Sequence, residues 1–204
     1  MFFRQIDKDI ALSLSIPQYA EELFELTDRN RDFLQQWLPW LDRIKVASDT
    51  KDFIEAQLLK FQRGEALHVT IFYQDLIAGV VGYNQIDRDN NIGHLGYWLA
   101  KEYNGKGIMT KSVRELIEIG FDYYNLNRID IRCAEGNSRS RAIPERLGFE
   151  NEGVIRQGEK LSDKPNGQGN SPDRRLTTTS DAEASRASLR YVDHVVYGLL
   201  KEDR

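Results

Sequence analysis

Residues 102–110 read Glu-Tyr-Asn-Gly-Lys-Gly-Ile-Met-Thr and lie between an apolar segment, 92–100, and a segment with helical periodicity, 113–124. Glycines at a strand-to-helix turn let the backbone approach a ligand closely. The first turn of the following helix adds unpaired N–H groups and the positive end of the helix dipole. The stretch therefore predicts a loop that binds phosphate or pyrophosphate.

Three phosphate-binding motifs compete for this loop. A Walker loop and a dinucleotide fingerprint both require a glycine where the chain has Thr110. The spacing [Q/R]-x-x-G-x-[G/A] is met at Gly105 and Gly107, with Glu102 in place of the usual Gln or Arg. From these glycines alone, a plain helix-opening turn stays open. A nucleoside triphosphatase built on residues 105–112 is the least favoured interpretation, and it predicts magnesium-dependent ATP binding.

The segments around the loop alternate between strand and helix patterns. The periodicity predicts two short helices between Pro17 and Leu41, a helix that begins at the capping residue Asp49, and a brief helix that ends at Gly148. Alternating apolar positions predict strands at 68–73, 76–86, 92–100, 129–133 and 191–200. This order is typical of an α/β (α+β) fold, and residues 1–204 are predicted to form a single domain.

One segment departs from this pattern. Residues 162–190 contain no aromatic side chain and include Pro-Asn-Gly-Gln-Gly-Asn-Ser-Pro, 165–172. Such a composition buries too little apolar surface to offset the entropy of ordering. We predict a flexible insertion within the domain, and a regulatory or partner-binding insertion is the alternative.

Composition and charge exclude several classes of protein. The formal net charge is −4 over 204 residues, which argues against a protein that binds duplex nucleic acid. The single cysteine excludes an intrachain disulfide, and the histidines lack zinc-site spacing, so no metal is predicted. With no signal-like start and no apolar run near the roughly 20 residues of a membrane span, a cytoplasmic protein is expected.

Several conspicuous side chains have structural interpretations. Cys133 alternates with Ile129 and Ile131, so a buried thiol is favoured over a nucleophile. His194 is interpreted as a strand residue that faces solvent or a cleft rather than as a catalytic base. Trp37 and Trp40 flank Pro39, and core and pocket positions are equally compatible with this spacing.

Further motifs carry a family resemblance. Gly-Tyr-Trp-Leu at 96–99, Asn-x-x-Ser at 137–140, Leu-Gly-Phe at 147–149, Trp-Leu-Pro-Trp at 37–40 and the closing 191–201 accompany the glycine loop. Over residues 1–161 and 191–204 the chain resembles the GNAT acetyltransferases, and within them the RimJ/RimL-type branch that acetylates ribosomal-protein N-termini. Residues 162–190 are a departure from that family.

The resemblance implies a mixed, mostly antiparallel sheet flanked by helices, with a V-shaped splay between two parallel central strands. It implies acetyl-CoA as co-substrate, with the pantetheine along residues 97–99 and the pyrophosphate on the N–H groups of residues 104–110. The implied cofactor-binding residues are Tyr97, Trp98, Leu99, Asn104, Gly105, Lys106, Gly107, Ile108, Met109, Thr110, Asn137 and Ser140.

The resemblance also implies catalytic roles. Glu159 matches the position of the family's proposed base, and an exposed surface glutamate is the equally weighted alternative. Many GNAT enzymes protonate the thiolate with a tyrosine where this chain has Pro144, so Ser140 becomes the candidate proton donor or sulfur contact, with a helix cap as its alternative. Pro144 predicts a helix that starts late or is kinked. The N–H of Leu99 is the expected oxyanion donor, and Trp37 and Trp40 are the expected substrate-binding residues.

The implied reaction is direct acetyl transfer to a primary amine, without a covalent enzyme intermediate. The implied acceptor is the N-terminal serine or alanine of a ribosomal protein. A small amine of the polyamine type is the runner-up, and a non-catalytic acyl-CoA-binding module is the rival from another class. No nucleic acid or membrane partner is expected, and dimers are common in the branch, so a homodimer is an expectation.

Overall fold

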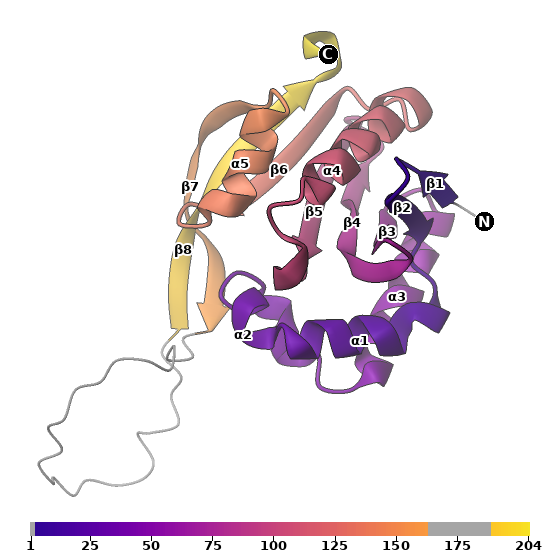
Figure 1. Ribbon diagram of the computed structural model, residues 1–204. Coiled ribbons are helices and arrows are strands. Elements are labelled where there is room, and N and C mark those ends of the chain that lie inside the picture. Colours follow the sequence, from indigo (N-terminus) through magenta and orange to yellow (C-terminus); the bar gives the residue numbers. More distant parts are fainter. Residues whose placement is uncertain (1–2, 163–188) are drawn as a thin grey trace, which may run out of the picture.

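The computed structural model describes residues 3–162 and 189–204. Their strands form one sheet of eight, in the order β1-β2-β3-β4-β5-β6-β8-β7 (Figure 1). The strands are β1 Phe3–Gln5, β2 Ile10–Leu14, β3 Leu67–Tyr73, β4 Leu76–Asp87, β5 Ile92–Leu99, β6 Arg128–Ala134, β7 Glu150–Ser162 and β8 Leu189–Leu200.

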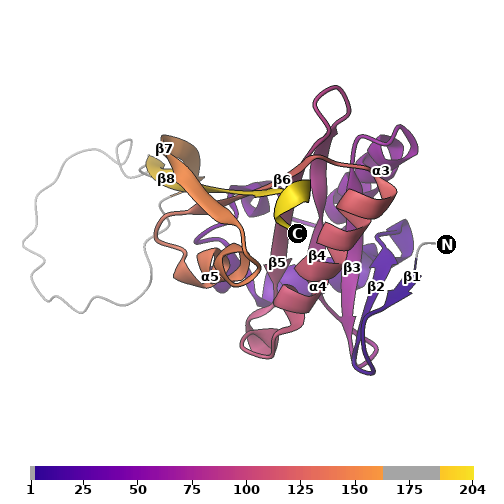
Figure 2. The same cartoon turned by 90° about the horizontal axis from the view of Figure 1, so that it is seen from above.

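Helices cover both faces of the sheet. They are α1 Ala20–Arg29, α2 Arg31–Leu34, α3 Ala47–Gln62, α4 Ile108–Glu118 and α5 Ser138–Arg146. Helices α4 and α5 lie on one side of the sheet and α3 on the other (Figure 2). Alternating residues of β4 reach the two sides: Val81 packs with α4, whereas Val80 packs with α1 and α3.

The sheet is antiparallel except at its centre. Strands β5 and β6 are parallel, and their pairing runs only from Ile92↔Arg128 to Leu95↔Ile131. Both strands continue beyond this point, β5 to Leu99 and β6 to Ala134, so they diverge. The predicted fold, including the splay between two parallel central strands, is confirmed. The backbone groups of β5 that face the gap have no strand partner on that side, so they are available to a ligand.

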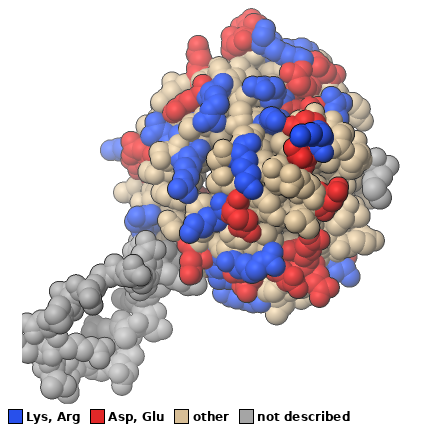
Figure 3. Space-filling view, viewed as in Figure 1, with Lys and Arg blue, Asp and Glu red and all other residues tan. Residues whose placement is uncertain are grey.

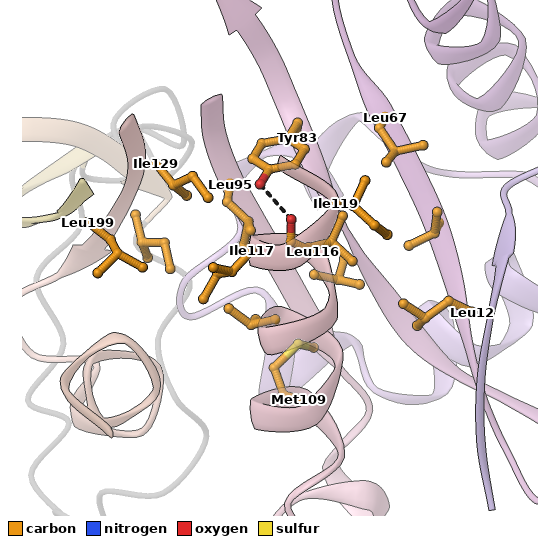
Figure 4. Packing of buried hydrophobic residues seen from close by; sticks show 14 of the residues in the cluster. Leu12, Leu67, Tyr83, Leu95, Met109, Leu116, Ile117, Ile119, Ile129 and Leu199 are labelled. Carbon is orange, nitrogen blue, oxygen red and sulfur yellow. Dashed lines mark hydrogen bonds between the residues drawn. The ribbon is translucent and has the colours of Figure 1, made fainter. Parts of the chain in front are cut away.

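The main hydrophobic core fills the space between α4 and the sheet (Figure 4). Val113, Leu116 and Ile117 from the predicted helical stripe are buried there. The Tyr83 hydroxyl donates a hydrogen bond of 2.7 Å to the carbonyl oxygen of Leu116. A π-helical turn, Ile119–Tyr123, then ends the helix, so the 113–124 periodicity spans both elements. This packing fixes the start of α4 relative to β5.

Two expectations at helix starts are wrong. Asp49 does not cap α3 from outside; it is the third residue of the helix, and its carboxylate accepts the backbone N–H groups of Lys45 and Val46. Helix α5 begins at Ser138 and contains Pro144, so of the two alternatives predicted for this proline the late start does not occur and the kink stays a prediction. The N-cap of α5 is Asn137, whose side-chain oxygen accepts the N–H of Ser140, so Ser140 is not the cap.

The sequence patterns do not predict three of the strands. Strands β1 and β2 are short, and only β2 is mostly buried. Strand β7 has mostly exposed side chains and two irregularities in its pairing with β8, which obscure the alternation of apolar residues. The predicted insertion lies almost entirely outside the described residues. No helix in the described part of the chain has the length and apolar character needed to span a bilayer.

Candidate active site

The glycine loop joins β5 to α4 as the sequence predicts. Gly105 and Gly107 have φ of 79° and 75°, a left-handed conformation that favours glycine, and a Cβ at either position would meet nothing within 4 Å. Gly107 is the N-cap of α4. Asn104 steadies the loop because its amide donates to the carbonyl oxygens of Ala100 and Lys101 at 2.9 and 3.2 Å. The N–H groups at the start of α4 therefore lie beside an open, glycine-lined surface.

The helices beside this loop carry basic side chains. They are Lys111, Arg114, Arg139, Arg141 and Arg146 of α4 and α5, and Lys and Arg side chains gather over these helices in Figure 3. Lys111 is paired with Asp7, and Arg141 with Glu145. The Arg146 guanidinium donates to the Thr110 hydroxyl at 2.9 Å and joins the two helices. The combination of helix N-terminus, left-handed glycines and nearby cations fits the phosphates of a CoA molecule.

A cavity of about 440 Å³ runs from the loop along the diverging end of β5. One wall is β5 and the other is the start of α5, and α2 and the residues after it cover the opening. Of the predicted cofactor residues, it is lined by Tyr97, Trp98, Leu99, Asn104, Met109, Asn137 and Ser140. The other five predicted residues belong to the loop and the first turn of α4: Gly105, Lys106, Gly107, Ile108 and Thr110. Ile108 is fully buried and offers only its backbone N–H.

Three polar side chains meet where β5 and β6 diverge. The Ser140 hydroxyl lies 3.2 Å from the Cys133 sulfur and 3.4 Å from the Tyr97 hydroxyl. Burial raises the pKa of the Cys133 thiol and holds the pKa of Tyr97 well above its usual value. Both groups are consequently neutral at pH 7. Ser140 is the hydroxyl at the centre of this cluster.

The backbone of α5 explains the position of Tyr97. A proline has no N–H, so Pro144 cannot donate to the carbonyl oxygen of Ser140 one turn earlier. The Tyr97 hydroxyl donates to that oxygen instead, at 3.0 Å. Pro144 thus leaves an acceptor that a tyrosine of β5 satisfies. This link connects the start of α5 to the diverging strand.

A second cavity, of about 810 Å³, opens from the first toward the α1 and α3 side of the sheet. The two share Trp37, Leu38, Tyr97, Trp98, Asn137 and Ser140. Trp40 lines the larger one and lies 6.5 Å, between ring centroids, from Trp98. Trp37 and Trp40 therefore occupy pocket positions. The volume is typical of ligand-binding sites.

The charged groups of the larger cavity nearly balance. Lys60 and Arg132 line it together with Asp130 and Glu159. Asp130 is already bonded to Arg128 at 2.6 Å, and His94 lies 3.5 Å away. Burial lowers the pKa of His68 to about 4, so this imidazole is neutral at pH 7. The described residues that line the cavity therefore carry no large excess of positive or negative charge.

Glu159 lines the larger cavity from β7, and about a third of its side chain is exposed. Its carboxylate lies 3.1 Å from Nε2 of His194 on β8. The position is therefore at a cavity wall rather than on an open outer surface. Ser140 lines the same cavity, so the structure brings both predicted catalytic side chains to one space.

Sequence reasoning missed some features of this site. It gave Cys133 no place in the site, whereas Cys133 lines the larger cavity and is buried, as predicted. His194 faces the same cavity, which is one of the two orientations expected for it. It also assigned Tyr97 only a backbone role. The Tyr97 hydroxyl contacts Ser140, which lies 43 positions later in the sequence, and no local sequence pattern predicts such a contact. Within residues 3–162 and 189–204, no group of three or more His, Cys, Asp or Glu side chains could hold a metal ion.

Comparisons with known proteins agree with this geometry. The family model described as an acetyltransferase (GNAT) domain matches residues 12–150. A putative ribosomal N-acetyltransferase of Bacillus subtilis is 34% identical over 159 residues, which cover 78% of this chain and 87% of the relative. The ribosomal-protein-serine acetyltransferase of Escherichia coli is 30% identical over 159 residues, covering 78% of this chain and 89% of the relative.

A solved structure extends the likeness to the whole chain. RimL, a ribosomal L7/L12 alpha-N-protein acetyltransferase in complex with coenzyme A, superposes with a TM-score of 0.82 at 26% identity and covers 100% of both chains. In that complex, coenzyme A forms a disulfide with a cysteine of RimL.

Proposed function

Because this chain belongs to the GNAT acetyltransferase family and is an acetyl-CoA-dependent N-acetyltransferase, we propose that it acetylates the N-terminal serine or alanine of a ribosomal protein. The observation that carries the proposal is the pair of cavities that meet at Ser140. The smaller one leads to the glycine loop and fits the cofactor, and the larger one is open to an acceptor from the opposite side of the sheet. The relatives' names supply the class of acceptor.

The binding groups for CoA belong to three elements. The N–H groups of residues 104–110 would hold the pyrophosphate, the diverging edge of β5 at residues 97–99 would pair with the pantetheine, and Asn137 and Ser140 would lie near the sulfur. The single cysteine of this chain, Cys133, is 3.2 Å from Ser140. A coenzyme A–cysteine disulfide in a structural relative supports a cofactor sulfur placed in this region.

The proposed reaction needs two proton transfers. When bound, acetyl-CoA supplies the acetyl group as a thioester. Glu159 accepts a proton from the acceptor amine, directly or through water; an α-amine has a pKa near 7.7–8.0, so a modest base suffices. The Ser140 hydroxyl donates a proton toward the departing sulfur. The N–H of Leu99 is the proposed donor to the developing oxyanion.

The charge of the acceptor cavity favours a peptide amine over a polyamine. A polyamine carries several positive charges and needs unpaired carboxylates. The described lining contains two carboxylates, and both have partners: Asp130 contacts Arg128 and Glu159 contacts His194. The aromatic wall that includes Trp37 and Trp40 suits a peptide segment with apolar surface. Homodimer formation stays a prediction from the family resemblance, and sedimentation at several protein concentrations tests it.

An acetylation assay with a panel of amines tests the proposal. Peptides that begin with serine or alanine, their N-acetylated controls and spermidine are incubated with acetyl-CoA, and the products are identified by mass spectrometry. We expect Glu159→Gln to lower kcat on the preferred peptide about 100-fold or more. The Kd for acetyl-CoA, measured by calorimetry, should change less than about twofold, because Glu159 lies outside the cofactor cavity.

Glu150→Gln is the matched control, since Glu150 is an exposed carboxylate on the same strand that lines neither cavity. It should retain the parent activity. If the parent binds acetyl-CoA but acetylates no amine, a non-catalytic acyl-CoA-binding module replaces the proposed enzyme. If spermidine is the preferred acceptor, the peptide assignment is wrong while the reaction type stands.

A further inference from the structure

Strand β7 carries a bulge immediately before Glu159. Ile155 pairs with His194, and the next pair along the two strands is Glu159 with Val192. Four steps along β7 therefore match two steps along β8, so β7 contains two extra residues at this point. The backbone N–H of Gln157, at a φ of 52°, donates to the Asp193 carboxylate at 2.7 Å and holds the bulge. This geometry sets where Glu159 enters the cavity.

His194 lies directly beside the bulge. Its ring contacts the position of Gly158, where an added Cβ would come within 3.2 Å of the His194 Cβ and 3.4 Å of Cγ. The absence of a side chain at residue 158 lets the imidazole lie against the bulged strand. From there Nε2 reaches the Glu159 carboxylate at 3.1 Å, and only 14% of the His194 side chain is exposed.

The chemistry of the pair determines the direction of this hydrogen bond. An ionised carboxylate only accepts hydrogen bonds, so Nε2 of His194 must carry the proton. The bond fixes the tautomer of the imidazole, the orientation of the ring and the orientation of the carboxylate.

We propose that His194 is the positioning residue for Glu159, holding its carboxylate directed into the acceptor cavity. This inference rests on the proposed role of Glu159 as base. His194 itself transfers no proton in this scheme, because its Nε2–H is bonded to the carboxylate throughout. Asp193 and His194, adjacent on β8, would then act together. Asp193 holds the bulge of β7, and His194 holds the side chain of Glu159, which follows the bulge.

Two substitutions separate the hydrogen bond from the volume of the side chain. His194→Leu keeps much of the volume and has no donor, and we expect it to lower kcat about 10- to 100-fold, as misplacement of a reacting group does. His194→Gln can place an N–H near the position of Nε2, and it should restore kcat to within about fivefold of the parent. The KM for acetyl-CoA should stay within about twofold in both, since His194 does not line the cofactor cavity.

Tyr191→Leu is the matched control for damage to the β7–β8 hairpin. Tyr191 lies on the same strand, is 54% exposed and lines neither cavity. Its kcat should equal that of the parent. If His194→Leu misfolds, as shown by a lost cooperative unfolding transition, His194→Asn takes its place, because the shorter amide lies near the position of Nδ1 and not of Nε2; its kcat should fall as expected for His194→Leu.

Rescue by the amide distinguishes positioning through a hydrogen bond from a merely structural role. A structural role depends on the volume of the side chain at residue 194, which leucine and glutamine both largely keep, so it would change kcat equally in the two variants. Positioning instead lowers kcat in His194→Leu and restores it in His194→Gln, because only the amide can donate to Glu159.

The outcomes for the two proposals are distinct. If the parent acetylates a peptide and Glu159→Gln abolishes turnover, but His194→Leu matches the parent in kcat, the positioning role is wrong and the proposed function stands. A parent without turnover overturns the proposed function itself. A loss of kcat in His194→Gln as large as in His194→Leu also contradicts positioning through a hydrogen bond.

Discussion

Cys133 illustrates how a single residue can belong to both a strand and a site. It is 3% exposed, and its sulfur lies within 3.2 Å of the Ser140 hydroxyl at the junction of the two cavities. Burial raises the pKa of its thiol, because the low-polarity surroundings disfavour the thiolate. The residue is therefore unreactive toward general reagents at neutral pH, and only a ligand that the cofactor cavity delivers should reach it.

We predict that CoA disulfide forms a mixed disulfide with Cys133. The Cys133 thiolate attacks one sulfur of the reagent, the new protein–CoA disulfide forms, and a CoA thiolate leaves. Since the thiolate is the attacking species and the pKa is raised, the rate should increase with pH from 7 through 9 and beyond. Intact-protein mass spectrometry measures the adduct, and acetyl-CoA should slow its formation by occupying the same cavity.

Cystamine, a disulfide without a nucleotide, is the control reagent. It should react more slowly at equal concentration, because the phosphate loop does not bind it. Cys133→Ser should give no adduct with either reagent, as the chain has one cysteine. Equal rates for cystamine and CoA disulfide would mean that the cavity does not deliver the cofactor sulfur to this residue.

At the scale of elements, α5 and β5 depend on one another. Helix α5 contains a proline that removes an internal hydrogen bond, and the Tyr97 hydroxyl from β5 satisfies the freed carbonyl oxygen of Ser140. A helix with an interior proline is ordinarily weakened. Here the weakened turn is also the place where the helix meets the diverging strand, so the contact fixes the separation of two walls of the cofactor cavity.

A double-mutant cycle between Tyr97→Phe and Pro144→Ala tests this dependence. In the parent, Tyr97→Phe removes the donor to the Ser140 carbonyl and should lower the free energy of unfolding by about 1 kcal/mol. With Pro144→Ala, the backbone N–H of the new residue can make the helical bond, so Tyr97→Phe should cost less. Urea unfolding of the four proteins should give a coupling energy of about 1 kcal/mol, provided that the m-values agree. An equal cost in both backgrounds would show that the hydroxyl does not replace the missing bond.

At the scale of the whole molecule, the divergence of β5 and β6 joins the two faces of the sheet. The cofactor cavity lies toward α4 and α5, and the acceptor cavity lies toward α1 and α3. The two cavities share Tyr97 and Ser140 where the pairing of β5 and β6 stops, so a cofactor and an acceptor that occupy them as proposed would approach each other through the sheet.

The hairpin of β7 and β8 gives a test of domain organisation. Ser162 pairs with Leu189, so the chain leaves and re-enters the sheet at adjacent positions. We predict that an Asn-Gly turn in place of residues 163–188 preserves the fold, since such a turn connects neighbouring antiparallel strands. Circular dichroism should be unchanged, the melting temperature should shift by less than about 3 °C, and the Kd for CoA should stay within about twofold. An insoluble product would show that the segment is required for folding.

Local features of the site are predictable from the sequence because they depend on neighbouring residues. Gly105 and Gly107 specify their left-handed turn through the absence of a Cβ, and the apolar period of α4 specifies which face is buried. Strand β7 illustrates the limit. Its two irregularities and its exposed side chains remove the alternation that marks a strand, so the element that carries Glu159 has no local signature.

The sequence by itself determined the phosphate-binding loop, the helix behind it, most of the strands and, through family resemblance, the reaction. Only the tertiary structure decided that Tyr97 satisfies Ser140 and that His194 contacts Glu159, contacts that join residues 43 and 35 positions apart. The physical reason is that backbone conformation follows from short-range sterics and periodicity, whereas a contact between distant residues depends on strand register and on where pairing stops.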